Sequence, residues 1–181
     1  AHKGEGIGNK FLSHNREVDA IVHVVRFFEN ADIIHVANKV DPESDAETIN
    51  TELALADLAT AQKLLYNAEK TAKGQGVEAK DAAAQLGILK KIITNLEQGL
   101  PARDIAFTEK ERELIQTSAL LTMKPMMYVA NVSEEQLRTA LPLTLTLSPS
   151  RARGNADVLS LSIQIEQEIA QLSEEEQKVF L

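Results

Sequence analysis

The sequence predicts an α/β fold whose sheet is interrupted by a long pair of antiparallel helices. Residues 20–25 and 126–132 are short, apolar runs with the length of strands, and the first is rich in β-branched residues. Between them, apolar residues recur at helical spacing from Ile49 to Leu100. The triplet Gly74-Gln75-Gly76 divides that stretch into two helices. Strands on both sides of one helical segment are typical of an α/β protein.

The beginning of the chain predicts a loop, a short helix and a strand. Gly4, Gly6 and Gly8 occupy alternate positions, which is typical of a flexible loop, and residues 10–17 follow as a short helix. Residues 20–25 then predict a buried strand. A Gly-x-x-x-x-Gly-Lys-[Ser/Thr] motif is missing from the whole sequence, so the glycine loop is not a phosphate-binding loop.

The helical stretch predicts a coiled-coil hairpin. Asp45 is the expected N-cap of its first helix, and a glycine-rich turn is suited to joining two antiparallel helices. In the second helix, apolar residues alternate spacings of four and three, the pattern of a coiled-coil seam. These residues are Ala82, Leu86, Leu89, Ile93, Leu96 and Leu100.

Charge sets the hairpin apart from the rest of the chain. The formal net charge is −8, which argues against a chain-wide electrostatic grip on nucleic acid. Between residues 60 and 100, however, lysines outnumber acidic residues. The lysines are Lys63, Lys70, Lys73, Lys80, Lys90 and Lys91, against Glu69, Glu78, Asp81 and Glu97. Such lysines form either a solvated face or a surface for RNA.

After the hairpin, the sequence predicts a helix over residues 108–121, with Thr108 and Glu111 as a capping box. The strand at 126–132 follows, and residues 141–154 have no helical period. A strand at 158–163, a helix at 165–172 and a last helix capped by Ser173 complete the prediction.

The strand at 126–132 ends in the polar tetrapeptide Asn131-Val132-Ser133-Glu134, where open α/β sheets present ligand-binding loops. GTPases have Asn-Lys-x-Asp there, and the Asp carboxylate accepts hydrogen bonds from guanine. Adenine turns an acceptor toward such a carboxylate, and a longer Glu misplaces it for guanine. The tetrapeptide therefore predicts a nucleotide site that prefers ATP.

A second match, Asn38-Lys39-Val40-Asp41, is a literal guanine-binding pattern. Four-residue matches arise often by chance, and context has to choose between them. Pro42 follows directly, and the next helix is far longer than one that normally flanks a sheet. This context disfavours a base-binding role for the second match.

Composition excludes several other classes. The chain has no cysteine, so thiolate metal sites and disulfides are excluded, and its four histidines have no metal-ligand spacing. His23 and His35 lie in apolar runs and are expected to be packing residues. No apolar run is long enough to cross a membrane, which suits a cytoplasmic protein.

In this order, the segments resemble the YchF group of Obg-like ATPases, P-loop proteins of the translation-factor class. The residues that carry the resemblance are Lys3–Leu12, His23–Arg26, Val40–Pro42, Ile49–Leu58, Leu121–Pro125 and Asn131–Glu134.

The resemblance implies a partial, Ras-like P-loop NTPase domain. Its first segment would be residues 1–45, its helical coiled-coil insertion 46–121, and its second segment 122–181. Gly4, Gly6 and Gly8 would belong to the switch loop. The nucleotide-binding residues would be Asn131, Val132, Glu134 and Ser162. The P-loop and the Mg²⁺ ligand would precede Ala1, with no metal ligand and no assigned catalytic residue in this chain, and a TGS domain would follow Leu181.

The resemblance also implies a function. The longer protein would be a ribosome-associated ATPase that binds ATP with Mg²⁺, also accepts GTP, and acts as a regulatory switch in translation or stress responses. Its partners would be one or both ribosomal subunits, and RNA through the hairpin, but no membrane. This chain alone would be inactive, because the P-loop is absent. The alternative is a helical interaction module with a vestigial nucleotide fold, which a P-loop motif upstream would argue against.

Overall fold

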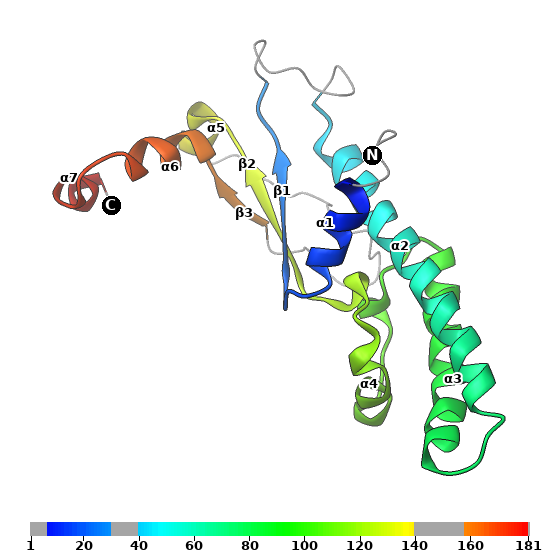
Figure 1. Cartoon of the computed structure of the whole chain (residues 1–181). Coiled ribbons are helices and arrows are strands. Elements are labelled where there is room, and N and C mark those ends of the chain that lie inside the picture. Colours follow the sequence, from blue (N-terminus) through cyan, green and yellow to red (C-terminus); the bar gives the residue numbers. More distant parts are fainter. Residues whose placement is uncertain (1–6, 30–39, 140–157, 181) are drawn as a thin grey trace. The chain divides into compact units, whose positions relative to one another are not determined.

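The computed structural model describes residues 7–29, 40–139 and 158–180, and Figure 1 labels most of their elements. These elements are α1 (Ile7–Asn15), β1 (Ile21–Arg26), α2 (Pro42–Thr71), α3 (Val77–Glu97), η1 (Ala102–Asp104), α4 (Glu109–Ile115), η2 (Gln116–Ser118), η3 (Leu121–Met123), β2 (Met126–Asn131), α5 (Glu134–Arg138), β3 (Val158–Leu161), α6 (Ile163–Ala170) and α7 (Glu174–Phe180).

The chain forms two compact units. Among the described residues, the first unit contains 7–21 and 48–125, and therefore α1 and most of the helical hairpin. The second contains 22–29, 40–47, 126–139 and 158–180, and therefore the sheet and the helices that follow it.

The sheet of the second unit has the strand order β1-β2-β3. Strands β2 and β3 are parallel, with Val129 opposite Leu159 and Asn131 opposite Leu161. The backbone N–H of Phe27, just beyond β1, donates to the carbonyl of Asn131 at 2.8 Å. The arrows of β1, β2 and β3 in Figure 1 follow one direction. The carboxyl ends of the three strands therefore meet at one edge.

The two faces of the sheet differ in burial. On one face, Val25 and Tyr128 are buried against Ala46 in the first turns of α2. On β1 and β3, Val22, Val24 and Leu159 are 55%, 49% and 52% exposed. The prediction of a buried strand at residues 20–25 is therefore wrong for alternate positions, because only one face of β1 is covered within the described residues.

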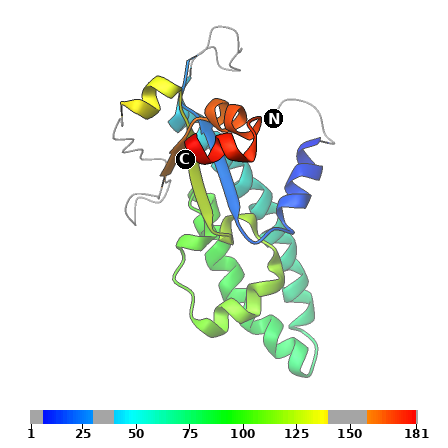
Figure 2. The ribbon, with the colours of Figure 1, turned by 90° about the vertical axis from the view of Figure 1, so that its left-hand side faces the viewer.

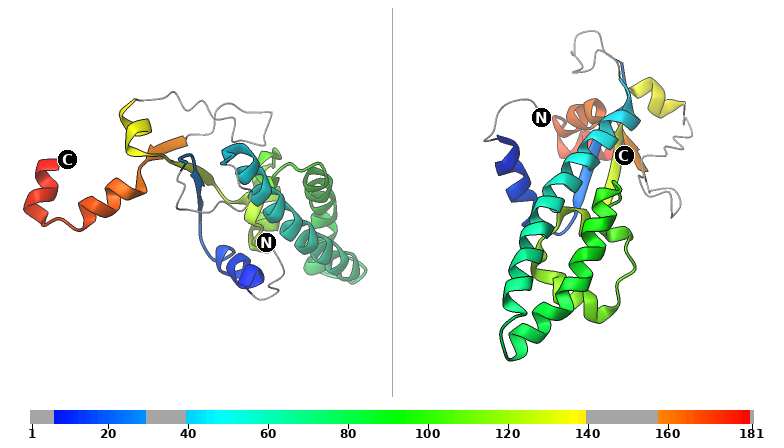
Figure 3. Two further views of the ribbon diagram at one scale, coloured as in Figure 1. Left: turned by 90° about the horizontal axis from the view of Figure 1, so that it is seen from above. Right: turned by 90° about the vertical axis from the view of Figure 1, so that its right-hand side faces the viewer.

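In the first unit, α2 and α3 run side by side in opposite directions, as Figures 1 and 3 show. A turn over residues 72–76 joins them, and Gly76 has φ 99°, a conformation that suits glycine. Each helix buries residues seven apart. They are Ala54, Ala61 and Ala68 in α2, and Ala82, Leu89 and Leu96 in α3. Alanines at the contact let two helices approach closely, which makes this pair the core of the unit.

The predicted seam of α3 is incomplete. Ile88 and Ile92 are 3% and 0% exposed, although neither belongs to the predicted stripe. They pack in one cluster with Ala102, Ile115 and Leu120, from the segment that follows the hairpin. Helix α3 is thus buried on two sides, and a two-helix pattern accounts for only one of them. Figure 2 shows α4 and this segment beside the hairpin.

Several element boundaries differ from the prediction. Helix α1 begins at Ile7, so Gly8 is helical and not part of a loop. Helix α4 ends at Ile115 and is followed by η2, which shortens the predicted 108–121 helix. Helix α6 begins at Ile163, two residues early, because β3 ends at Leu161.

Other local predictions are confirmed. The capping box of Thr108 with Glu111 forms, and Ser173 caps α7 through hydrogen bonds exchanged with Glu176. The unusual segment 141–154 lies outside the described residues, as does His35. Within the described part of the chain, no helix is both long enough and apolar enough to span a bilayer.

Candidate functional site

The carboxyl ends of β2 and β3 bring Asn131 and Ser162 to the same place. Asn131 lies opposite Leu161 in the parallel ladder, and the N–H of Val132 donates to the carbonyl of Leu161 at 3.0 Å. The side-chain oxygen of Asn131 accepts a hydrogen bond from the N–H of Ile163 at 3.1 Å. Two predicted site residues far apart in the sequence therefore lie at one edge of the sheet, where α/β folds bind ligands.

The bond from Ile163 also fixes which way the Asn131 amide points. An amide oxygen has two lone pairs, and the ladder end uses one of them. Within the described residues, the other lone pair and the NH₂ group remain as an acceptor and a donor held side by side. A planar amide presented in this way matches a partner with one acceptor and one donor on the same edge.

Val132 contributes through its backbone only. The residue as a whole is 3% exposed and its N–H is used by the sheet. Among the contacts of the described residues, its carbonyl oxygen is the main-chain group without a hydrogen bond. Any base contact by Val132 would therefore use an acceptor.

Ser133 makes the loop after β2 rigid. Its hydroxyl accepts from the N–H of Gln136 at 3.2 Å, and the Gln136 side chain accepts from the N–H of Ser133 at 2.8 Å. Gln136 also donates to the carbonyl of Phe27 at 3.1 Å, which connects the loop to the end of β1. The Ser-x-x-Gln pattern of Ser133 and Gln136 is the local signal that predicts such a capping box.

Glu134 and Ser162 have contrasting environments. Glu134 is the first residue of α5 and pairs with Arg138 at 2.7 Å, and their side chains are 59% and 78% exposed. An exposed pair of this kind is weak and can open for a ligand. Ser162 is 2% exposed and occupies the N-cap position of α6 without a capping hydrogen bond from its side chain.

In the competing Asn38–Asp41 match, the Asp41 carboxylate has a structural role. Asp41 accepts from the N–H of Ser44 at 3.2 Å and precedes Pro42, the first residue of α2. Asp41, and not the predicted Asp45, is thus the N-cap, with proline at the first helical position as expected. Asn38, Lys39, Gly4 and Gly6 lie outside the described residues.

His23 is a packing residue in this structure, as predicted. Its ring lies 5.4 Å from that of Tyr128, measured between centroids. Burial lowers the pKa of His23, and the charge of Asp45 opposes that shift. The neutral form that results suits a side chain within a half-covered sheet.

A second polar cluster, which sequence analysis did not single out, surrounds Asp57 in the first unit. Asp57 is fully buried on α2, and its carboxylate accepts from the N–H of Leu121 at 3.0 Å. It also accepts from the N–H and the hydroxyl of Thr122, at 2.6 and 2.8 Å. A single acidic residue inside the apolar run Leu53–Leu58 was the available signal.

No family model matches the chain. It is 46% identical over 183 residues to the ribosome-binding ATPase YchF of Bacillus subtilis, covering all of this chain and 49% of that protein. It is 49% identical over 136 residues to Obg-like ATPase 1 of Saccharomyces cerevisiae, covering 74% of this chain and 34% of that protein. The relatives that match this chain over its whole length are about twice as long, so the chain spans about half of each.

The fold also matches a solved structure. The Schizosaccharomyces pombe YchF GTPase superposes with a TM-score of 0.80 at 34% sequence identity, covering 98% of this chain and 48% of that one. The names of these relatives differ in the nucleotide that they give, ATP for the first two and GTP for the third.

Proposed function

Because the chain belongs by homology to the YchF and Obg-like ATPase family, we propose that it supplies the base-binding edge of a P-loop NTPase that prefers ATP and also accepts GTP. The observation that carries the proposal is the Asn131 amide, fixed at the carboxyl ends of two parallel strands. In this proposal, residues 1–45 and 122–181 form parts of one Ras-like domain, and residues 46–121 form its coiled-coil insertion.

The chemistry of the edge favours adenine. Both purines offer N7 to the NH₂ group of Asn131, and adenine adds an amino group that the remaining lone pair of Asn131 can accept. The carbonyl oxygen of Val132 is a further acceptor for that amino group. Guanine has the acceptor O6 at the same position, which faces these oxygens unfavourably. Ser162 adds a buried hydroxyl to the same edge.

The remaining groups of the nucleotide need residues beyond this chain. A triphosphate requires a Gly-x-x-x-x-Gly-Lys-[Ser/Thr] loop, which this sequence does not contain. Mg²⁺ neutralises charge on the phosphates when it is bound. We place both the P-loop and the Mg²⁺ ligand in the other half of the longer protein, with Gly4, Gly6 and Gly8 in the switch segment. The isolated chain is then expected to hydrolyse no ATP.

The base preference can be tested in the full-length protein. Glu134→Asp shortens the carboxylate and is expected to shift the ratio of GTP to ATP affinity toward GTP, because a charge-assisted bond to guanine contributes about 1.5–3 kcal/mol. Adding Val132→Lys would complete a guanine motif, but the buried Val132 side chain makes that change a folding defect. Asp41→Ala is the control, since Asp41 caps the start of α2 and lies outside the tetrapeptide after β2. A loss of base selectivity in Asp41→Ala, with no effect in Glu134→Asp, would contradict the proposal.

We also propose that the longer protein binds the ribosome and works as a regulatory switch in translation or stress responses. The names of its relatives support ribosome binding, and the six hairpin lysines are all exposed. One of them, Lys91, is paired with Glu111 at 2.8 Å. Lys70, Lys73 and Lys80 lie nearest the hairpin turn and form no ion pair recorded within the described part of the chain, so they are the better candidates for RNA contact.

Co-sedimentation with ribosomes tests this second proposal. Reversing Lys70, Lys73 and Lys80 to Glu should weaken binding most at low salt, and the difference from the unmodified protein should narrow as salt rises. Lys110→Glu, an exposed charge reversal on α4, is the control. If the triple variant binds like the unmodified protein at every salt concentration, the hairpin lysines only solubilise the helices.

A helical interaction module with a vestigial nucleotide fold is the competing function. It predicts no nucleotide binding even by the full-length protein, and a calorimetric titration with ATP separates the two.

A further inference from the structure

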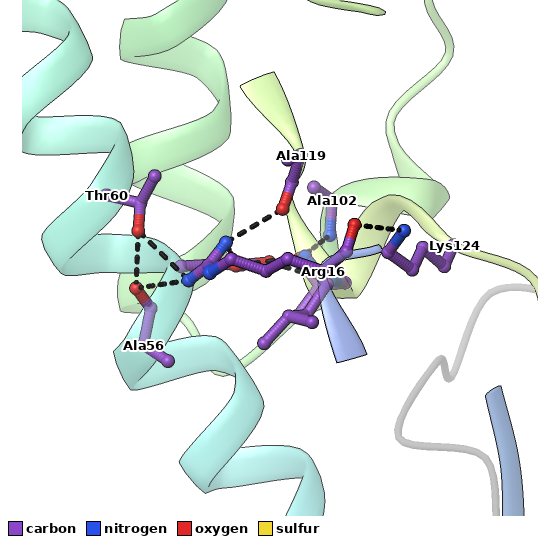
Figure 4. A network of polar contacts seen from close by, with 9 residues as sticks. Arg16, Ala56, Thr60, Ala102, Ala119 and Lys124 are labelled. Atoms are coloured by element: carbon purple, nitrogen blue, oxygen red, sulfur yellow. Dashed lines mark hydrogen bonds and ion pairs between the residues drawn. The ribbon is translucent and has the colours of Figure 1, made fainter. Parts of the chain in front are cut away.

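We propose that Arg16 is a detachable connector through which the nucleotide state reaches the α2–α3 hairpin. This inference rests on the proposed function, because it assumes that the glycine segment before α1 senses the nucleotide. Its basis is the set of contacts that Arg16 makes at the end of α1, drawn in Figure 4.

The Arg16 guanidinium holds three pieces of the first unit together. One nitrogen contacts the Asp57 carboxylate at 3.2 Å and donates to the carbonyl of Ala119 at 2.8 Å. The other donates to the carbonyl of Ala56 at 3.3 Å and to the hydroxyl of Thr60 at 3.0 Å. A single side chain therefore links α1 both to α2 and to the turn before η3. The planar fork of arginine makes this pattern possible, and lysine cannot reproduce it.

Arg16 can move away without leaving the Asp57 carboxylate unbonded. Asp57 is fully buried, but three donors from Leu121 and Thr122 remain bonded to it when Arg16 is removed. The Arg16 side chain is 23% exposed, so it has a path to water. A charge that retains its hydrogen bonds tolerates the loss of one partner better than a charge left bare. The pair is thus suited to two states, docked and released.

The turn at Ala119, whose carbonyl accepts from Arg16, is strained. Ala119 has φ 50°, and no other non-glycine residue in the described part of the chain has a positive φ. This left-handed conformation costs about 1 kcal/mol or more in an alanine and persists only where its surroundings enforce it. The carbonyl of Ala119 is one of the groups that Arg16 binds. Release of Arg16 removes a contact that stabilises the strained turn.

A second contact fixes the backbone on which Arg16 stands. Lys124 donates to the carbonyl of Arg16 at 3.0 Å and also to the carbonyl of Val18. The end of α1 is therefore attached both to the hairpin and to the residues that lead into β2. A displacement of α1 by the nucleotide would pull on this backbone and draw the guanidinium away from α2.

Hydrogen exchange in the full-length protein tests the connector. Exchange of the amides in residues 116–122 and the affinity for ATP are measured with and without the non-hydrolysable analogue AMP-PNP. In the unmodified protein, exchange in this segment should differ between the two states by about fivefold or more, the usual lower range of allosteric coupling. Arg16→Lys should exchange fast in both states, and because coupling is reciprocal, its ATP affinity should rise by no more than the same factor.

Two further variants make the test specific. Thr60→Val removes one acceptor of Arg16 without changing its charge, and should shrink the difference between states. Lys91→Ala breaks a different ion pair of this unit, with Glu111, and should leave the difference intact. A merely structural Arg16 predicts faster exchange in Arg16→Lys with the difference between states retained, and that result overturns the connector.

The outcomes also separate this inference from the function on which it rests. If the unmodified protein binds no ATP, the proposed function fails and the connector falls with it. If ATP binds but exchange in residues 116–122 does not depend on it, only the connector is refuted.

Discussion

The two units each contain a polar cluster, and the clusters differ in how their groups are satisfied. Around Asp57, the carboxylate, the backbone donors and the guanidinium all find partners within the chain. At the strand ends of the second unit, the Asn131 side chain is fixed by a hydrogen bond from Ile163 and, among the described residues, keeps an NH₂ group and a lone pair. A cluster whose described groups are all bonded to one another offers none of them to a ligand, whereas a fixed but incompletely bonded one at the carboxyl ends of parallel strands is suited to bind a ligand.

Removal of the Asp57 carboxylate is the most damaging single change that we predict. Asp57→Leu leaves the backbone donors of Leu121 and Thr122 buried without an acceptor, and should cost about 3–5 kcal/mol of unfolding free energy. Urea denaturation measures it. Asp81→Ala, an exposed acidic residue on α3, is the control and should change stability by less than about 0.5 kcal/mol. Equal effects of the two variants would mean that the Asp57 cluster contributes no more to stability than an exposed charge does.

In contrast to Asp57→Leu, Asn131→Ala should impair nucleotide binding more than stability. It removes one hydrogen bond at a strand end, so the unfolding free energy should fall by about 1 kcal/mol. In the full-length protein, its ATP affinity should fall by about tenfold or more, as expected for the loss of a bidentate contact to the base. Calorimetric titration measures the affinity. A variant that binds ATP normally but unfolds easily would assign Asn131 a structural role like that of Asp57.

Relief of backbone strain in the Asp57 cluster should stabilise the first unit. Ala119→Gly removes the penalty of φ 50° and is expected to raise the unfolding free energy by up to about 1 kcal/mol. Ala106→Gly, at an exposed position without a positive φ, should instead destabilise slightly because glycine gains entropy when unfolded. Thermal unfolding distinguishes the two, and a loss of stability in Ala119→Gly would show that the turn is not strained.

The smallest effect concerns a surface pair. Hydrogen bonds from Lys91 and then from Thr108 lower the pKa of Glu111 from 4.5 to about 2. A lowered pKa in the folded state means that Glu111 stabilises the protein above pH 4.5, and that this contribution is lost as the pH falls toward 2. Glu111→Gln should flatten the pH dependence of the unfolding free energy over that range. An unchanged slope would mean that the pair is not formed in solution.

Local signals predicted much of the fold. The strand at residues 126–132, the glycine turn of the hairpin and the capping box of Thr108 all depend on residues close together in the sequence, and all three are found. The errors occur where distant segments decide the outcome. Ile88 and Ile92 are buried by the segment after the hairpin, and Val22 and Val24 are exposed because one face of β1 has no cover among the described residues.

The sequence by itself determined the family, the polar tetrapeptide after the second strand and the lysine-rich character of the hairpin, because motifs, strand length and charge are properties of neighbouring residues. Only the tertiary structure placed Ser162 beside Asn131, through the parallel pairing of β2 with β3. It also revealed the partners of Asp57, which lie 41 residues before it and 64 and 65 residues after it. Hydrogen bonds between such distant residues exist only once the chain has folded, so no spacing rule can anticipate them.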